Sequence, residues 1–215
     1  MTATVTLVDY GAGNLLSVAR AFRHLGTEVV LADTPVAIAA ATRLVLPGVG
    51  AFAACMAELE QKGLVDAVRR FAAGGKPFLG ICIGMQMMFE GSDEFGTTRG
   101  LGLLPGWVRA IPTTDGGGRR RKVPHIGWNA LHPANGASGW NDPLMGEIAP
   151  GDSVYFVHSF AVEPTERADT LAECDYEGAR LLAAARRGNL AGCQFHPEKS
   201  GPVGLRILRG FLDGK

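Results

Sequence analysis

The chain has 215 residues with 21 basic and 21 acidic side chains, so its formal net charge is zero, and 47% of its residues are apolar. This composition excludes a disordered chain, which lacks apolar material to bury, and argues against a general nucleic-acid binder, which needs a positive field. A transmembrane protein is excluded because no run of about 18 apolar residues is present. The length suits one large domain, expected to span 1–215.

In the first 90 residues, apolar runs alternate with turn signals and helical periodicity. Strands are expected at 5–8, 29–31, 43–46 and 77–81, and helices at 15–25, 35–41, 51–71 (interrupted near Gly63) and 82–89. The strand runs are continuously apolar, as in strands buried on both faces. The alternation therefore predicts an α/β fold whose central, mostly parallel sheet carries helices on both faces.

The second half is richer in Gly, Pro and Trp and indicates an antiparallel sheet region added to the parallel one. Strands are expected at 108–111, 123–131 and 154–157, and 113–122 is expected to form an exposed loop. Segments 181–187 and 190–195 suggest a hairpin joined at Gly188-Asn189. A helix over 202–212 closes the chain, and no linker long enough to separate two domains is found.

The four cysteines lie far apart, at Cys55, Cys82, Cys174 and Cys193. Without a CxxC pair we expect no metal site, and no cofactor motif is complete. Four cysteines in a chain of this length do not resemble a secreted disulfide scaffold. The first residues also lack the basic stretch and long apolar core of a signal peptide, so a cytoplasmic protein is expected.

A candidate nucleophile lies in the segment Gly80-Ile81-Cys82-Ile83-Gly84, between an expected strand and an expected helix. This is the nucleophile-elbow pattern with Cys at its centre, and the glycines leave room for the sharp turn that exposes the sulfur. The expected helix N-terminus would favour the reactive thiolate. The alternative is that Cys82 is a small buried apolar residue, the usual fate of a free cysteine.

A cysteine nucleophile needs a base, and His196-Pro197-Glu198 is the best candidate. On an extended segment residues i and i+2 face the same way, so Glu198 is placed to orient the His196 ring. His158, after the strand at 154–157, is the second candidate base. The alternative for His196 is a His-Pro turn that caps the last helix.

Acyl transfer also needs backbone donors for the oxyanion, and Pro47-Gly48-Val49-Gly50 offers them at an expected strand end. The N–H of Ile83, directly after the nucleophile, is a further donor. Taken alone, the Pro-Gly-x-Gly segment is only a turn. Its place at a carboxyl strand end favours a binding role.

Two other motifs have ordinary interpretations. Gly11-Ala12-Gly13 lacks the third glycine of a dinucleotide loop because Leu16 stands there, so a turn with Asn14 as helix N-cap is favoured. The basic run Arg119–Lys122 follows three glycines and is expected to be a solvated loop. A contact with an acidic partner, a phosphate or nucleic acid is the alternative.

Three motifs together resemble the class I, triad-type glutamine amidotransferases: PGVG at 47–50, GICIGMQ at 80–86 and FHPE at 195–198. Three further segments resemble the glutaminase subunits of imidazole glycerol phosphate synthases. These segments are VDYGAGN at 8–14, PHIGWN at 124–129 and YFVHSF at 155–160. The resemblance covers residues 5 to about 211 and implies the flavodoxin-like fold of the class.

The resemblance also implies roles for individual residues. Cys82 would attack the side-chain amide of glutamine, His196 would act as base and then as acid, and Glu198 would orient it. Val49, Gly50 and Ile83 would form the oxyanion hole. The remaining site residues would hold the amino-acid end of the substrate: Gln86, Glu94 and the backbone of His158, Ser159 and Phe160, which stands where the family also has Tyr.

The implied partner is a (β/α)₈-barrel cyclase subunit in a heterodimer, with Trp128, Asn129 and Tyr155 at the interface. Ammonia would pass to the cyclase, which converts the nucleotide PRFAR into imidazole glycerol phosphate and AICAR in histidine biosynthesis. Reorientation of the Val49 peptide would switch the glutaminase on. Two alternatives stay open: a glutaminase serving aminodeoxychorismate, pyridoxal phosphate or GMP synthesis, and a catalytically silent binding or regulatory module.

Overall fold

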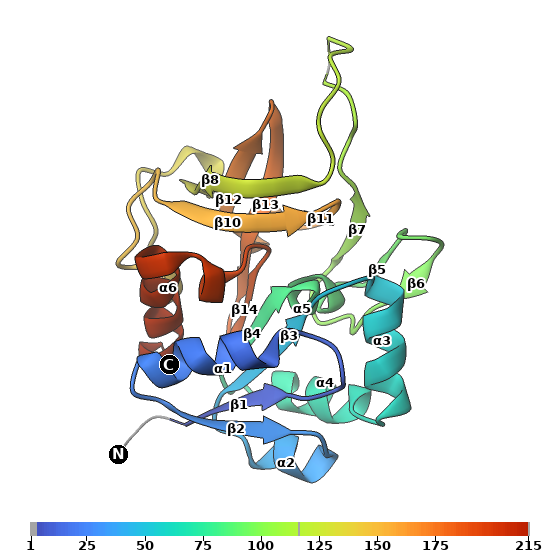
Figure 1. Ribbon diagram of the computed structural model, residues 1–215, viewed down its shortest axis with the longest axis vertical. Helices are drawn as coiled ribbons and strands as arrows, with labels where there is room; N and C mark the ends of the chain where they lie inside the picture. The colour runs from blue at the N-terminus through green and yellow to red at the C-terminus, as the bar shows by residue number, and fades with distance from the viewer. Residues whose placement is uncertain (1–3, 116, 215) are drawn as a thin grey trace.

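A mixed eight-stranded sheet forms the centre of the protein, seen in a computed structural model that describes residues 4–115 and 117–214. Its strand order is β2-β1-β3-β4-β14-β13-β12-β9 (Figure 1). The strands are β1 (Thr4–Val8), β2 (Glu28–Ala32), β3 (Leu44–Gly48), β4 (Phe78–Cys82), β9 (His132–Pro133), β12 (Thr170–Tyr176), β13 (Ala179–Arg187) and β14 (Leu190–Cys193). The pairs from β2 through β14 are parallel, whereas those from β14 through β9 are antiparallel. The expected α/β class is confirmed.

Helices cover both faces of the parallel part. They are α1 (Leu15–His24), α2 (Pro35–Ala40), α3 (Phe52–Gln61), α4 (Val65–Ala73), α5 (Ile83–Met87) and α6 (Gly201–Asp213). The chain moves one way in the sheet from β1 to β2 and the other way from β2 to β3, so right-handed crossovers place α1 and α2 on opposite faces. Phe22 of α1 packs edge-on against Phe211 of α6, with ring centroids 6.3 Å apart.

Reversal of the strand order beside β1 creates the crevice in which open α/β sheets bind ligands, at the carboxyl ends of the strands. β3 ends there at Gly48 and β4 ends at Cys82, and the parallel register places these two residues opposite each other. The chain leaves β14 at the same edge and continues to His196. The sheet thus brings three segments that are far apart in sequence to one place.

Two smaller sheets, one antiparallel and one mixed, lie above this edge (Figure 1). One pairs β8 (His125–Ala130) with β10 (Ser153–His158), and the other has the order β11-β7-β5-β6. The members of the second are β5 (Gly91–Ser92), β6 (Thr98–Arg99), β7 (Gly106–Ala110) and β11 (Phe160–Pro164). The antiparallel region and the hairpin of β13 with β14 are as expected, but β11 and β12 are strands that the sequence patterns did not predict.

The helix after Cys82 is shorter than expected, because α5 ends at Met87 rather than at Phe89. The α-helical bonding stops because the Met88 N–H donates to the Met85 carbonyl and the Phe89 N–H to the Gln86 carbonyl, each three residues back at 3.1 Å. A later segment binds the next two carbonyls. Leu101 donates to the Met87 carbonyl at 2.7 Å, and Leu103 donates to the Met88 carbonyl at 2.8 Å.

The loop expected at 113–122 projects from the body as an extended hairpin (Figure 1), and Gly116 lies outside the described residues. The expectation that the basic run is wholly solvated is wrong for Arg121, whose side chain is buried. Its guanidinium donates to four backbone carbonyls, those of Pro112, Thr114, Tyr176 and Glu177. Arg119 is exposed and pairs with Asp115.

The short 3₁₀ helices are η1 (Ala134–Gly136), η2 (Pro143–Met145), η3 (Arg167–Asp169) and η4 (Pro197–Lys199). Of these, η4 matters for function because it follows His196 directly and leads into α6. Among the helices that the structure describes, none has the length and apolar character needed to cross a membrane.

Candidate active site

Cys82 stands on a strained turn between β4 and α5. Its backbone φ of 55° is a left-handed value that residues with a side chain rarely adopt, as at a nucleophile elbow. A Cβ at Gly84 would lie 1.8 Å from the Leu46 carbonyl oxygen, and one at Gly80 would lie 2.7 Å from the Met85 backbone. Backbone atoms therefore exclude any side chain at both flanking positions, which explains the two glycines.

The helix behind this turn has only five residues, so its dipole is a weaker source of positive potential than the sequence suggested. Ile83 opens the helix, and its N–H has no partner within the helix because the first turn of any helix leaves such groups free. The imidazole of His196 supplies the positive charge next to the sulfur instead.

His196 lies between Cys82 and Glu198. Its Nδ1 is 2.8 Å from Oε1 of Glu198, and both side chains are almost fully buried. Burial alone would lower the pKa of His196, but its interactions with Cys82 and Glu198 outweigh burial and raise the pKa to about 9. The site therefore favours an imidazolium beside the Cys82 sulfur. Glu198 reaches the ring from the 3₁₀ helix η4 rather than from the extended segment that we expected.

The other three thiols lie in surroundings that keep them protonated. Burial raises the pKa of Cys55, Cys174 and Cys193. All four cysteines are free. Of the four, only Cys82 combines a free thiol with a neighbouring imidazole, and this pairing distinguishes the candidate nucleophile from a buried apolar cysteine.

The second candidate base, His158, is occupied on both ring nitrogens. Its Nδ1 lies 2.8 Å from the Phe160 carbonyl, and its Nε2 lies 3.0 Å from Nδ1 of His125. Burial lowers the pKa of His158 to about 4, against a small opposing effect of the Phe160 carbonyl. A ring with no free lone pair is not available to take a proton from Cys82, so His158 has a structural role here.

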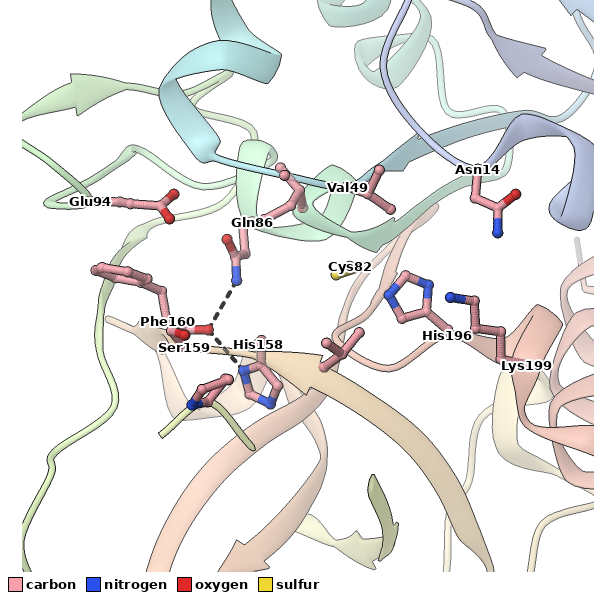
Figure 2. A pocket seen from close by; sticks show the side chains of 14 residues that line it. Asn14, Val49, Cys82, Gln86, Glu94, His158, Ser159, Phe160, His196 and Lys199 are labelled. Atoms are coloured by element: carbon pink, nitrogen blue, oxygen red, sulfur yellow. Dashed lines mark hydrogen bonds between the residues drawn. The ribbon is translucent and has the colours of Figure 1, made fainter. Parts of the chain in front are cut away.

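Cys82, His196 and the oxyanion segment line one cavity of about 540 Å³. Its lining residues are Asn14, Val49, Gly50, Cys82, Ile83, Gln86, Glu94, Pro124, Val157, His158, Ser159, Phe160, His196 and Lys199. Figure 2 shows Cys82 between two groups of residues, with His196, Lys199 and Asn14 on one side and Gln86, Glu94 and Phe160 on the other. Every residue assigned to catalysis, the oxyanion hole or substrate binding lines this cavity, except Glu198 behind His196.

Hydrogen bonds hold both Gln86 and Glu94 in place. Gln86 Nε2 donates to the Phe160 carbonyl at 3.1 Å and to Oε1 of Gln194 at 3.0 Å (Figure 2). Its own Oε1 is buried and has no hydrogen-bond partner among the described residues. Glu94 accepts from the Phe52 N–H at 2.6 Å and so caps α3, whose N-cap residue Ala51 provides no side-chain cap. One acceptor on each side chain stays available to a ligand.

Three polar residues near the nucleophile were missed or given another role. Lys199 and Asn14 line the cavity, and Gln194 is fully buried with its Nε2 3.9 Å from the Cys82 sulfur. Asn14 also accepts from the Ser17 N–H, as its expected role of helix N-cap requires. Lys199 and Gln194 flank the FHPE segment directly, and that adjacency is the only sequence signal that would have found them.

The expected interface residues lie on the sheet of β8 with β10. Trp128 and Tyr155 are paired in register with ring centroids 6.2 Å apart, and Trp128 is 58% exposed. Ile126, two residues earlier on the same face of β8, is 57% exposed. Asn129 faces inward instead, donating to the Asp175 carbonyl at 2.8 Å.

Comparison of the sequence with known proteins shows which family it matches. A family model described as "Glutamine amidotransferase class-I" matches residues 6–214. The chain is 48% identical over 210 residues to the imidazole glycerol phosphate synthase subunit HisH 1 of Legionella pneumophila (strain Lens), covering 98% of this chain and 99% of that protein. It is 43% identical to the chloroplastic imidazole glycerol phosphate synthase hisHF of Arabidopsis thaliana, covering 99% of this chain and 34% of that longer protein.

Solved structures agree on the fold. The PurLQS structure from Thermotoga maritima matches with a TM-score of 0.74 at 18% identity, covering 99% of both chains. A glutamine amidotransferase from Thermotoga maritima matches with a TM-score of 0.58 at 17% identity, covering 99% of this chain and 84% of that one. At such identities the likeness concerns the fold alone.

Proposed function

Since the chain belongs to the class-I glutamine amidotransferases, as a glutaminase subunit of imidazole glycerol phosphate synthase in histidine biosynthesis, we propose that Cys82, His196 and Glu198 carry out its reaction. The observation that carries this proposal is the position of His196, which is hydrogen-bonded to Glu198 and lies beside Cys82 in a ligand-sized cavity. The family membership argues against both a silent binding module and a glutaminase serving another synthase.

The proposed reaction has two stages. The Cys82 sulfur attacks the side-chain amide carbon of glutamine, and the developing oxyanion is held by backbone N–H groups of Val49, Gly50 and Ile83. The C–N bond then breaks as His196 gives its proton to the leaving nitrogen, which yields ammonia and a glutamyl thioester. Water attacks the thioester while His196 takes its proton, the bond between carbon and sulfur breaks, and glutamate is released as His196 returns the proton to the Cys82 sulfur.

The side of the cavity away from His196 suits the amino-acid end of glutamine. The buried Oε1 of Gln86 lacks a partner among the described residues and is an acceptor for the α-ammonium group. The second carboxylate oxygen of Glu94 adds a negative charge on the same side (Figure 2). Backbone groups of His158, Ser159 and Phe160 complete the wall. Glutamine carries no phosphate group, so binding it needs no excess of basic residues, which is consistent with the zero net charge of the chain.

We propose that the partner is a separate (β/α)₈-barrel cyclase subunit, bound in a heterodimer. The exposed Ile126 and Trp128 on β8 support a docking surface, and the adjoining strand β10 ends at the cavity wall with His158. In this arrangement ammonia passes to the cyclase without crossing bulk water, and the cyclase converts PRFAR into imidazole glycerol phosphate and AICAR. The four free cysteines support a cytoplasmic location for the complex.

Activation by the partner would act at the oxyanion segment, through a turn of the Val49 peptide that points its N–H at the reacting carbonyl. Gly50 has a φ of 99°, and a Cβ there would meet no atom within 4 Å, so a larger residue would act through backbone conformation alone. Replacing Gly50 with Ala is expected to change the stimulated rate of glutamate release. An unchanged rate would remove the support for this switch.

Glutamate release tests the function as a whole. It is measured for the chain alone, with the cyclase barrel, and with the barrel plus its nucleotide substrate. Stimulation that requires the liganded barrel supports the proposal. Absence of release under all three conditions, with folded protein and a formed complex, would refute it.

A further inference from the structure

Two buried side chains hold the backbone turn that follows β3. The Tyr10 hydroxyl donates to the Pro47 carbonyl at 2.7 Å, and the Cys55 thiol donates to the Val49 carbonyl at 3.3 Å. These carbonyls lie on either side of Gly48, within the Pro47–Gly50 segment that faces the nucleophile. Tyr10 comes from the loop after β1 and Cys55 from α3, so the turn is held from two separate elements.

Both side chains are in a state to donate. Tyr10 is fully buried and Cys55 is 1% exposed. Burial raises the pKa of each, and the two groups lie near enough to affect one another's pKa. They therefore keep their protons at neutral pH, and each donates a hydrogen bond to one carbonyl of the turn.

Holding a carbonyl also fixes the N–H on the other side of the same peptide. In a trans peptide the two groups point in opposite directions, so a Val49 carbonyl directed at Cys55 turns the Gly50 N–H away from α3. In the same way, the hydrogen bond from Tyr10 to the Pro47 carbonyl fixes the direction of the Gly48 N–H, which belongs to the same peptide. The Tyr10 hydroxyl additionally lies 3.0 Å from the position a Cβ would take at Gly48. The peptide between the two held carbonyls is the one that joins Gly48 to Val49.

We propose that Tyr10 and Cys55 are positioning residues of the oxyanion hole, which fix the peptides on both sides of the Gly48–Val49 peptide and so set where its N–H points during acyl transfer. This proposal rests on the proposed glutaminase function of the same site. Neither side chain lines the cavity, so both act on the reaction only through the backbone of the turn.

Because the oxyanion is held only as the carbonyl becomes tetrahedral, a misplaced donor lowers kcat and leaves glutamine binding unchanged. Loss of one neutral hydrogen bond is expected to lower kcat by about three- to tenfold. The KM for glutamine should stay within about twofold, since Gln86 and Glu94 are untouched.

The test uses the full complex with the cyclase barrel and its nucleotide substrate, in which glutamate release is measured for Tyr10→Phe, Cys55→Ala and Cys55→Ser. Cys174→Ala is the matched control for loss of a buried thiol. Tyr176→Phe is the matched control for a hydroxyl that donates to a backbone carbonyl, that of Lys122 at 2.6 Å, away from the cavity. Thermal melting checks the fold of each variant, and iodoacetamide labelling of Cys82, read by peptide mass spectrometry, reports the nucleophile independently.

We expect lower kcat in Tyr10→Phe and Cys55→Ala, partial recovery in Cys55→Ser, and normal values in both controls, with Cys82 labelling unchanged throughout. If the wild-type complex is active and kcat is unchanged in both Tyr10→Phe and Cys55→Ala, the proposal is overturned. An equal loss of kcat in the two control variants would also overturn it. A wild-type complex that releases no glutamate would instead refute the proposed function on which it rests.

Discussion

Two histidines line the same cavity on different sides of Cys82 (Figure 2), yet their surroundings are opposite in effect. His196 faces a carboxylate and a thiol, and its pKa is raised to about 9. His158 faces a carbonyl and another imidazole, and burial lowers its pKa to about 4. Both are buried, so burial does not decide which one serves as base. The partners of each ring decide it, because a carboxylate stabilises the imidazolium and a second imidazole does not.

The largest expected effect comes from removing the ring that pairs with Cys82. His196→Asn should lower kcat for glutamine hydrolysis by about a thousandfold, because the same ring activates the nucleophile and protonates the leaving nitrogen. Steady-state glutamate release in the complex measures it. Activity within tenfold of wild type would show that another group is the base.

A smaller and different effect is expected at the other histidine. His158→Asn removes the donor to the Phe160 carbonyl, which also receives the Gln86 amide. We expect the KM for glutamine to rise about fivefold with little change in kcat, since one hydrogen bond that orients the substrate wall is lost. A collapse of kcat as large as that of His196→Asn would contradict the division of roles between the two rings.

The smallest effect concerns stability against pH, and the two histidines should act in opposite directions. The raised pKa of His196 gives stability that is present below about pH 6.5 and lost as the pH rises toward 9, at most about 3 kcal/mol. The lowered pKa values of His158 and His125 give stability that is present above about pH 6.5 and lost as the pH falls through 4.

Urea unfolding from pH 4 to 10 separates these contributions. The free energy of unfolding of His196→Asn should no longer fall with rising pH on the alkaline side. That of His158→Asn should no longer fall with decreasing pH to the same extent on the acid side. Glu198→Gln should move the alkaline loss to lower pH, because it removes one of the charges that raise the His196 pKa. Parallel curves for all variants would refute the assigned environments.

Local sequence predicted the parts of the site that depend on local backbone geometry. Gly80 and Gly84 have to be glycine because backbone atoms lie within 3 Å of where a Cβ would be. The five-residue elbow pattern around Cys82 is enough to predict this requirement. Glu198 is two residues from His196, so their contact was predictable too, although it is made through η4. The parallel strands between residues 5 and 82 were predicted from the continuous apolar runs in that part of the sequence.

Features that depend on distant partners were not predictable in this way. Strand β12 carries the buried Glu173, which pairs with Arg167 and Arg180, and its register against β13 shifts twice, so no alternation is visible. Arg121 is buried against backbone carbonyls, and two of these lie more than 50 residues downstream, so its burial was not visible in the local sequence. The state of His158 depends on His125, which lies on another strand.

The most direct test of the central claim is to trap the acyl-enzyme. The complex with its liganded cyclase is mixed with glutamine, quenched in acid within one turnover, and the peptide containing Cys82 is analysed by mass spectrometry. The account predicts a glutamyl group on Cys82 in wild type and none in His196→Asn, whereas Cys55, Cys174 and Cys193 stay unmodified. Glutamate release in the complex with Cys82 replaced by Ala, at a rate near that of wild type, would contradict it.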